Sequence, residues 1–317
     1  MASKLRGHSR PAPRLRVMKR PFLPGSSSLL ARRPVLRPLL TLLGVVAGLA
    51  SSAAAQDAAA LVGPVTRAQL RQPPYASWFE RNYADGAPDP SVAASLAPKL
   101  AGISIEAYFG TWCGDSRRQI PRLARLLDEA HAPENTLTLI GLSDRTGEFK
   151  QSPGRPEAAR LVHRTPTLIV LREGREIGRI VETPAASLGA DLLAILDGKG
   201  KAPKYPAEAW VHRLFSEKPS AEAIRTLATA DDQVKSLGET DSLSHYAEHD
   251  LLKNGRPREA VALLELYLRL YPDSAHGHVL MAEAFRDLGR AEDSANWARK
   301  ALSLDKANAR ARKLLEQ

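Results

Sequence analysis

The chain's only cysteine lies in the stretch Thr111-Trp112-Cys113-Gly114-Asp115-Ser116. An apolar run at 103–109 precedes it and an amphipathic segment at 120–127 follows it, so we expect Cys113 where a strand ends and a helix begins. The amides and the dipole of a first helical turn stabilise a thiolate. Two cysteines spaced Cys-x-x-Cys after a strand are typical of dithiol redox chemistry, but here Ser116 takes the second place. The pattern therefore indicates a reactive thiol with no partner for an intramolecular disulfide.

The residues from 102 to 198 alternate between strand and helix patterns. We expect strands at 103–109, 137–142, 167–171 and 176–182, and helices at 116–130, 156–163 and 187–196. Glu173 and Gly174 favour a tight turn, so the last two strands should form an antiparallel hairpin. This order predicts an α/β domain at 101–198 in which helices flank a central mixed sheet.

Two motifs of this domain resemble the thioredoxin superfamily. The first runs from Gly110 to Ser116 and continues with two basic residues and Pro121. The second, at 164–167, is Arg-Thr-Pro-Thr and is similar to the cis-proline loop that faces the active cysteine in that superfamily. The resemblance covers residues 100–198, with the preceding segment included. It implies a thioredoxin-like fold, thiol-disulfide exchange and a cis peptide bond at the proline of the second motif.

The resemblance also implies roles for single residues. Cys113 would be the catalytic thiol, with Trp112 packed beside it and Ser116 able to donate a hydrogen bond to it. The Thr165-Pro166 segment would offer a backbone edge to an extended substrate. Asp115 is a third candidate for substrate binding, although its charge opposes a thiolate, whereas the basic residues at 117 and 118 favour one. The expected substrate is a protein with a cysteine or a disulfide.

Two departures from the thioredoxin pattern leave the function open. Without a second cysteine, a mixed disulfide at Cys113 needs an outside thiol for its release. Thioredoxins also carry a buried carboxylate six residues before the nucleophile, where this chain has Ala107. One hypothesis is an exchange or isomerase-like activity. The alternative is a redox-inert adaptor in which Cys113 packs as a small apolar residue and the fold binds partner proteins.

The segment at 56–100 holds an aromatic cluster of Tyr75, Trp78, Phe79 and Tyr83 among several prolines. We interpret it as a short helical arm whose rings cap the core of the α/β domain. A substrate groove is the alternative.

A second module follows a linker at 199–206, which contains glycine and two prolines. Residues 207–317 read as helices, and from position 241 a repeat with a period of 34 aligns Gly255 with Gly289 and Leu251 with Phe285. This period is that of tetratricopeptide repeats, here at 241–274 and 275–308, with capping helices at 207–230 and 308–315. Such repeats bind protein partners, and we expect the α/β domain to fold without them.

No metal or cofactor site is expected. His245 and His249 have the i, i+4 spacing of metal ligands, and His276 and His278 follow one repeat later. Neither an acidic residue nor a cysteine completes the pattern, so we interpret these histidines as exposed on the repeat surface. A glycine-rich phosphate loop and a Gly-x-Ser-x-Gly motif are both missing from the sequence.

The net charge of +10 is concentrated at the N-terminus. Ten of the 45 basic residues fall in the first 55 positions, which hold no acidic residue, so the rest carries 35 basic against 35 acidic residues. That balance argues against a nucleic-acid partner. The basic start, the uncharged stretch at 38–55 and the small residues before Gln56 predict a signal peptide at 1–55 and a periplasmic or secreted protein. Arg32-Arg33 resembles a twin-arginine signal, and an uncleaved anchor is the alternative that would bring membrane contact.

Overall fold

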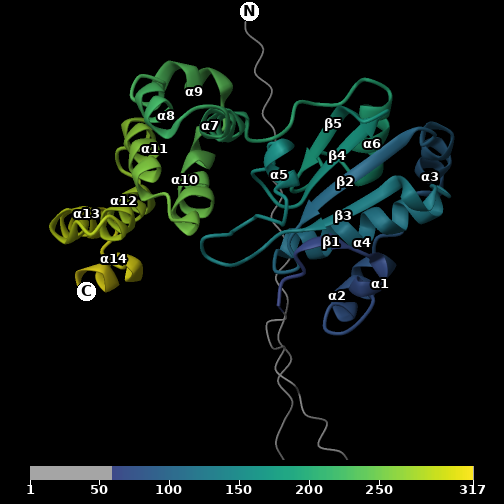
Figure 1. Cartoon of the computed structure of the whole chain (residues 1–317), viewed down its shortest axis with the longest axis horizontal. Helices are drawn as coiled ribbons and strands as arrows, with labels where there is room; N and C mark the ends of the chain where they lie inside the picture. Colours follow the sequence, from purple (N-terminus) through teal and green to yellow (C-terminus); the bar gives the residue numbers. More distant parts are fainter. Residues whose placement is uncertain (1–58, 317) are drawn as a thin grey trace, which may run out of the picture. The chain divides into compact units, whose positions relative to one another are not determined.

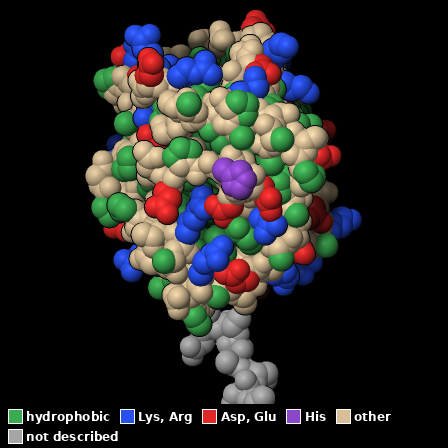
Figure 2. All heavy atoms as spheres, turned by 90° about the vertical axis from the view of Figure 1, so that its right-hand side faces the viewer, with side chains coloured by type: hydrophobic (Ala, Val, Ile, Leu, Met, Phe, Trp, Pro, Cys, Tyr) green, Lys and Arg blue, Asp and Glu red, His purple; other side chains and the backbone are tan. Residues whose placement is uncertain are grey.

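The computed structural model describes residues 59–316, so the expected signal peptide and its cleavage site lie outside the described residues. Within that range none of the helices combines the length and the apolar character that a membrane crossing requires. Figure 2 shows one face of the molecule, on which acidic and basic side chains are intermixed.

The N-terminal part of the described chain is built on one mixed sheet in the order β1-β3-β2-β4-β5 (Figure 1). Strand β2 runs parallel to β3, and the pairs β1-β3, β2-β4 and β4-β5 are antiparallel. The strands are β1 (Gly63–Val65), β2 (Ile103–Phe109), β3 (Leu137–Gly141), β4 (Thr167–Arg172) and β5 (Arg175–Val181). The expected mixed sheet and hairpin are confirmed.

Strand β1 escaped the sequence analysis. It has only three residues and carries Pro64 at its centre, and proline is tolerated in a sheet only where its missing N–H is not needed. As an edge strand β1 pairs only with β3, and an edge is the place in a sheet where a proline is tolerated.

Helices cover one face of this sheet, because α4 and four other helices share an apolar core with β2. The helices of this part are α1 (Arg67–Leu70), α2 (Ala76–Ala84), α3 (Pro90–Leu96), α4 (Gly114–Glu129), α5 (Pro156–Ala159) and α6 (Leu188–Leu196), with 3-10 turns η1 (Ala97–Lys99) and η2 (Glu134–Thr136). Along β2 the side chains alternate, so that Ala107 joins this core while Tyr108 joins a smaller cluster on the other face.

The expected helix at 156–163 is wrong in its extent. Helix α5 ends at Ala159, and Leu161 then takes a left-handed conformation with φ 52°. The amide of Val162 donates to the carbonyl of Glu157 at 2.9 Å and closes the turn. The apolar residues after α5 therefore bend toward the sheet instead of completing a second helical turn.

The aromatic arm packs on the core. Trp78 and Phe79 are buried with the apolar residues of α4 and the sheet, and the hydroxyl of Tyr83 donates to Asp128 at 2.7 Å. The rings therefore extend the core rather than line a groove.

The C-terminal part of the described chain is helical. It contains α7 (Pro206–Glu217), α8 (Ser220–Leu227), α9 (Asp231–Leu237), α10 (Leu243–Tyr246), α11 (Pro257–Leu270), α12 (Ala275–Asp287), α13 (Ala291–Leu304) and α14 (Ala309–Leu315). Helices α12 and α13 pack closely on either side of Gly289, which takes φ 73° at the turn. Before α11 the chain is irregular: a 3-10 turn η3 (Thr240–Ser242) precedes α10, and a π-helical turn η4 (Ala247–Leu251) and a 3-10 turn η5 (Leu252–Asn254) follow it.

We call residues 59–198 the sheet module and residues 206–316 the helical module. Each module has its own apolar core, and no apolar cluster of the described chain combines buried side chains from both. The contacts between the modules are therefore polar, charged or aromatic.

The core position of the arm gives a stability prediction. Phe79 is fully buried, so Phe79→Ala should lower the free energy of unfolding by about 3–5 kcal/mol, measured by urea denaturation of the full chain. Val62→Ala, at a 41 % exposed position, is the control and should change it by less than about 0.5 kcal/mol. Equal effects of the two variants would contradict the packing described.

Candidate functional site

Cys113 occupies the N-cap position of α4 and is half-buried. Its sulfur lies 3.4 Å from the carbonyl oxygen of Thr165, 52 residues further along the chain, and the thiol can donate a hydrogen bond to that oxygen. The peptide bond between Thr165 and Pro166 is cis. The structure thus brings together the two motifs that the sequence analysis singled out.

Ser116 lies beneath the start of α4 and is fully buried. Its hydroxyl oxygen accepts a hydrogen bond from the amide of Gly110 at 3.1 Å. Among the described residues, no hydrogen bond links Ser116 to the sulfur of Cys113. The serine thus connects the end of β2 to the first turn of α4. Sequence reasoning placed Ser116 beside the thiol, whereas the structure gives it a bond to the backbone.

Trp112 is held by three contacts. Its indole N–H donates to the carbonyl of Leu142 at 2.9 Å, and its ring packs against Phe149 with centroids 4.8 Å apart. Gly110 leaves the space that the indole fills, because a Cβ there would lie 2.4 Å from the ring. Phe149 in turn lies 5.8 Å from the ring of His249 in the helical module, so a row of rings runs from the thiol site to the second module.

The charged residues after the cysteine are engaged with their neighbours. Asp115 forms an ion pair with Arg118 one turn along α4, and the guanidinium of Arg117 donates to the carbonyl of Thr111 at 2.5 Å. Asp115 keeps a side-chain exposure of 36 % and is accessible from solvent.

Below the thiol the sheet offers no carboxylate. Ala107 is fully buried and is paired with Leu139 on one side and Leu168 on the other. Its neighbour Glu106 instead forms a two-bond ion pair with Arg160, at 2.9 and 2.7 Å. The described residues around the cysteine therefore lack an internal acid for proton transfer.

We call Thr165-Pro166 the thiol-facing loop, because the carbonyl of Thr165 faces the sulfur of Cys113. A cluster of buried charges adjoins this loop, and the sequence analysis missed it. Arg164 precedes Thr165 and makes two hydrogen bonds to Glu208 of α7, at 2.8 and 2.6 Å, and one to Glu182, at 2.9 Å. Lys150 pairs with Asp250 of the helical module at 2.8 Å. We call Lys150, Arg164, Glu182, Glu208 and Asp250 the junction cluster.

Burial dominates the electrostatics of this cluster. It raises the pKa of Glu208 to about 7, although the bonds from Arg164 act to lower it. Burial also acts to lower the pKa of Arg164, but Glu208 and Glu182 outweigh that effect and raise it. Burial also raises the pKa of Asp250, although the charge of Lys150 acts to lower it.

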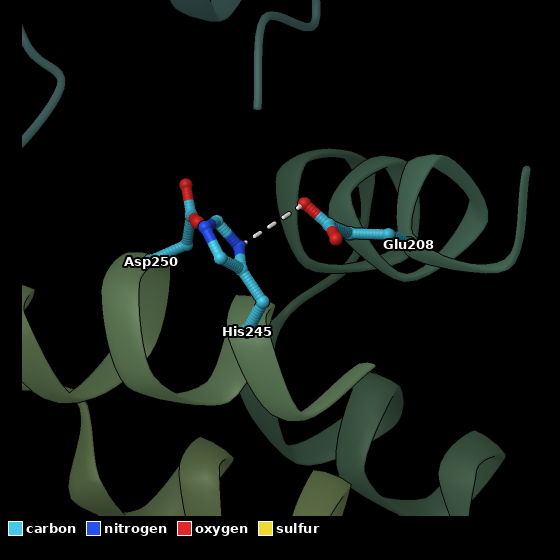
Figure 3. Close-up of side chains that lie close together, drawn as sticks. All are labelled: Glu208, His245 and Asp250. Atoms are coloured by element: carbon cyan, nitrogen blue, oxygen red, sulfur yellow. Dashed lines mark ion pairs between the residues drawn. The ribbon is translucent and has the colours of Figure 1, made fainter. Parts of the chain in front are cut away.

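Three side chains of the helical module could in principle hold a metal ion. One ligand atom from each of Glu208, His245 and Asp250 lies within 4.8 Å of the others, and Nδ1 of His245 lies 3.8 Å from Glu208 (Figure 3). Both carboxylates are already bonded to cations, Glu208 to Arg164 and Asp250 to Lys150. Burial and the charges of Lys150 and Arg164 hold the pKa of His245 far below its usual value, and the same positive charges oppose a metal ion. The arrangement is better explained as ion pairs than as a metal centre.

The histidines depart from the expectation of an exposed row. His278 is buried and bonds to the carbonyl of Ser274, and only His276 keeps a largely open side chain, paired with Glu248. The acidic neighbours of His245 are Glu208 and Asp250. The sequence analysis did not connect them with the histidines, because neither follows the 34-residue repeat. A usable signal was present in Arg164, a charged residue between the apolar runs at 161–162 and 168–171.

No protein family, no curated protein and no solved structure matched the chain.

Three buried or partly buried histidines, His163, His212 and His249, predict a stability that depends on pH, and we call them the junction histidines. Burial lowers the pKa of His212 and of His249 to about 4 from the ordinary 6.5, and it lowers that of His163 as well. Between those values the unfolded chain binds more protons than the folded one, so stability should fall as the pH drops from 6.5 toward 4. Glu208 acts in the opposite sense, because its raised pKa lets the folded state take up a proton first.

Asp250, whose pKa burial also raises, acts in the same sense as Glu208. Four histidines with lowered pKa outnumber these two carboxyls, so the urea midpoint should be lower at about pH 5 than at about pH 7.5. His249→Phe keeps a ring beside Phe149 and should reduce the difference. A midpoint that is equal or higher at the lower pH would contradict this account.

Proposed function

We propose that the chain is an exported, thioredoxin-like protein that carries out thiol-disulfide exchange through Cys113 alone. The observation that carries the proposal is the sulfur at the start of α4, 3.4 Å from the carbonyl of Thr165 in the loop with the cis peptide bond. A half-buried thiol at a helix start, beside the loop with the cis peptide bond, suits attack on a disulfide substrate.

The proposed exchange begins with the thiolate of Cys113, which attacks one sulfur of a substrate disulfide. A sulfur–sulfur bond to Cys113 forms, the substrate disulfide breaks, and the second substrate sulfur leaves as a thiolate. In an isomerase-like cycle another thiol of the same substrate, as its thiolate, attacks the substrate sulfur of the mixed disulfide, so that a different disulfide forms and Cys113 leaves as a thiolate. In a reductive cycle an external dithiol does so and becomes oxidised, so the electrons balance in both cases.

Two features support release from outside rather than from within. Ser116 has no sulfur to offer and is engaged with Gly110, and Ala107 offers no acid for proton transfer. The proposal therefore includes an external thiol, or a thiol of the substrate, as an obligatory partner.

The helical module would be a tetratricopeptide-type module that recruits a second protein. The paired helices α12 and α13 and the period of 34 in the sequence support this assignment. The export signal that the first 55 residues resemble would place the protein in the periplasm or outside the cell, where substrate disulfides occur.

Trapping tests the proposal directly. Incubated with a protein substrate that carries a disulfide and then alkylated to block the free thiols, the full chain should show adducts on non-reducing gels that disappear when a small thiol is added. Cys113→Ala is the matched control and should form none. If the wild-type chain forms no adduct while its thiol remains intact, the redox-inert adaptor is favoured instead.

A second cysteine should add what the site lacks. Ser116→Cys places a resolving thiol one turn into α4 and should give slow reduction of insulin, slow because Ala107 leaves the proton-transfer role empty. Ala107→Asp added to Ser116→Cys should increase the rate, whereas Ala107→Asp alone should give no reduction. No gain from Ser116→Cys would mean that insulin does not reach the site.

A further inference from the structure

The loop that faces the thiol is attached to the helical module through one side chain. Arg164 is only 7 % exposed, and it forms ion pairs with two carboxylates, Glu208 of α7 and Glu182 just after β5. Its guanidinium also lies over the ring of Tyr205 at 4.0 Å, at the residue that caps α7. A planar guanidinium held on these sides has one orientation available.

The backbone around Arg164 passes this constraint to the thiol. The carbonyl of Arg164 accepts a hydrogen bond from the hydroxyl of Thr167 at 2.7 Å, and the carbonyl of Pro166 accepts one from the amide of Glu182 at 2.7 Å. Between these two bonds lies Thr165, whose carbonyl oxygen faces the sulfur of Cys113. The position of that oxygen therefore depends on the same carboxylates that hold Arg164.

We propose that Arg164 is a positioning residue, and that through its ion pair with Glu208 the helical module holds the Thr165-Pro166 loop against Cys113. The module then has a second role besides recruitment, since it sets how open the sulfur is and how well the loop presents its backbone edge. This inference rests on the proposed exchange function of Cys113.

Two reactions of the full chain separate the effects of the loop. Iodoacetamide is small, and its reaction requires only that the sulfur of Cys113 be accessible. The disulfide-linked dimer of acetyl-Ala-Cys-Ala-amide must also bind along the backbone of the Thr165-Pro166 loop. In Glu208→Gln the loop should loosen, so alkylation should become about fivefold faster while mixed-disulfide formation with the peptide becomes about fivefold slower. A general loss of structure would not move the two rates in opposite directions.

Two further variants complete the test, and the first controls for the loss of a two-bond ion pair at a more exposed place, since Arg310 is 45 % exposed. Glu283→Gln removes the same two-bond geometry from Arg310, at 3.1 and 2.6 Å within the helical module, and should change neither rate. If Glu208→Gln does not fold, Tyr205→Leu decides. It removes the ring beneath Arg164 and the hydrogen bond from the Tyr205 hydroxyl to Glu182 but keeps the ion pairs of Arg164, and both rates should shift in the same directions as above.

Unchanged rates in the folded variants, or two rates that move in the same direction, would overturn the positioning role. A wild-type chain that alkylates but never joins the peptide disulfide would instead overturn the exchange function itself, so the two failures are distinguishable.

Discussion

Arg164 carries a full positive charge into the contact between two modules that share no apolar core. Removing a guanidinium from water costs several kcal/mol unless carboxylates and hydrogen bonds replace the lost hydration. Glu208 supplies two of those bonds and Glu182 a third. These bonds join three segments: α7, the end of β5 and the loop at Thr165. The relative positions of the three segments depend on them.

A polar junction has different consequences from an apolar one. Buried ion pairs add little net stability compared with apolar packing, but breaking one partner is costly, and this favours a single geometry. Lys150 and Asp250 repeat the same arrangement nearby, and the junction histidines stay neutral because burial lowers their pKa. The proposed link between the helical module and the thiol follows from that geometric constraint rather than from the strength of any one bond.

The sequence predicted the parts of the fold that depend on local pattern. The apolar runs of β2 and β4 and the turn at Gly174 gave the strands and the hairpin, and the apolar face of α4 gave the helix after Cys113. The three-residue strand β1 and the early end of α5 depend on edge pairing and on one left-handed residue, which periodicity does not report. The partners of Arg164 are 44 and 18 residues away, so they could be identified only in three dimensions.

Native-state hydrogen exchange of the full chain tests the central claim most directly. The amide of Glu182, bonded to the carbonyl of Pro166, reports on the thiol-facing loop, and the amide of Ala209, bonded to the carbonyl of Tyr205, reports on α7. If Arg164 and Glu208 join these segments, the two amides should exchange with the same free energy of opening. A loop that opens at a lower free energy while α7 stays closed would contradict the account.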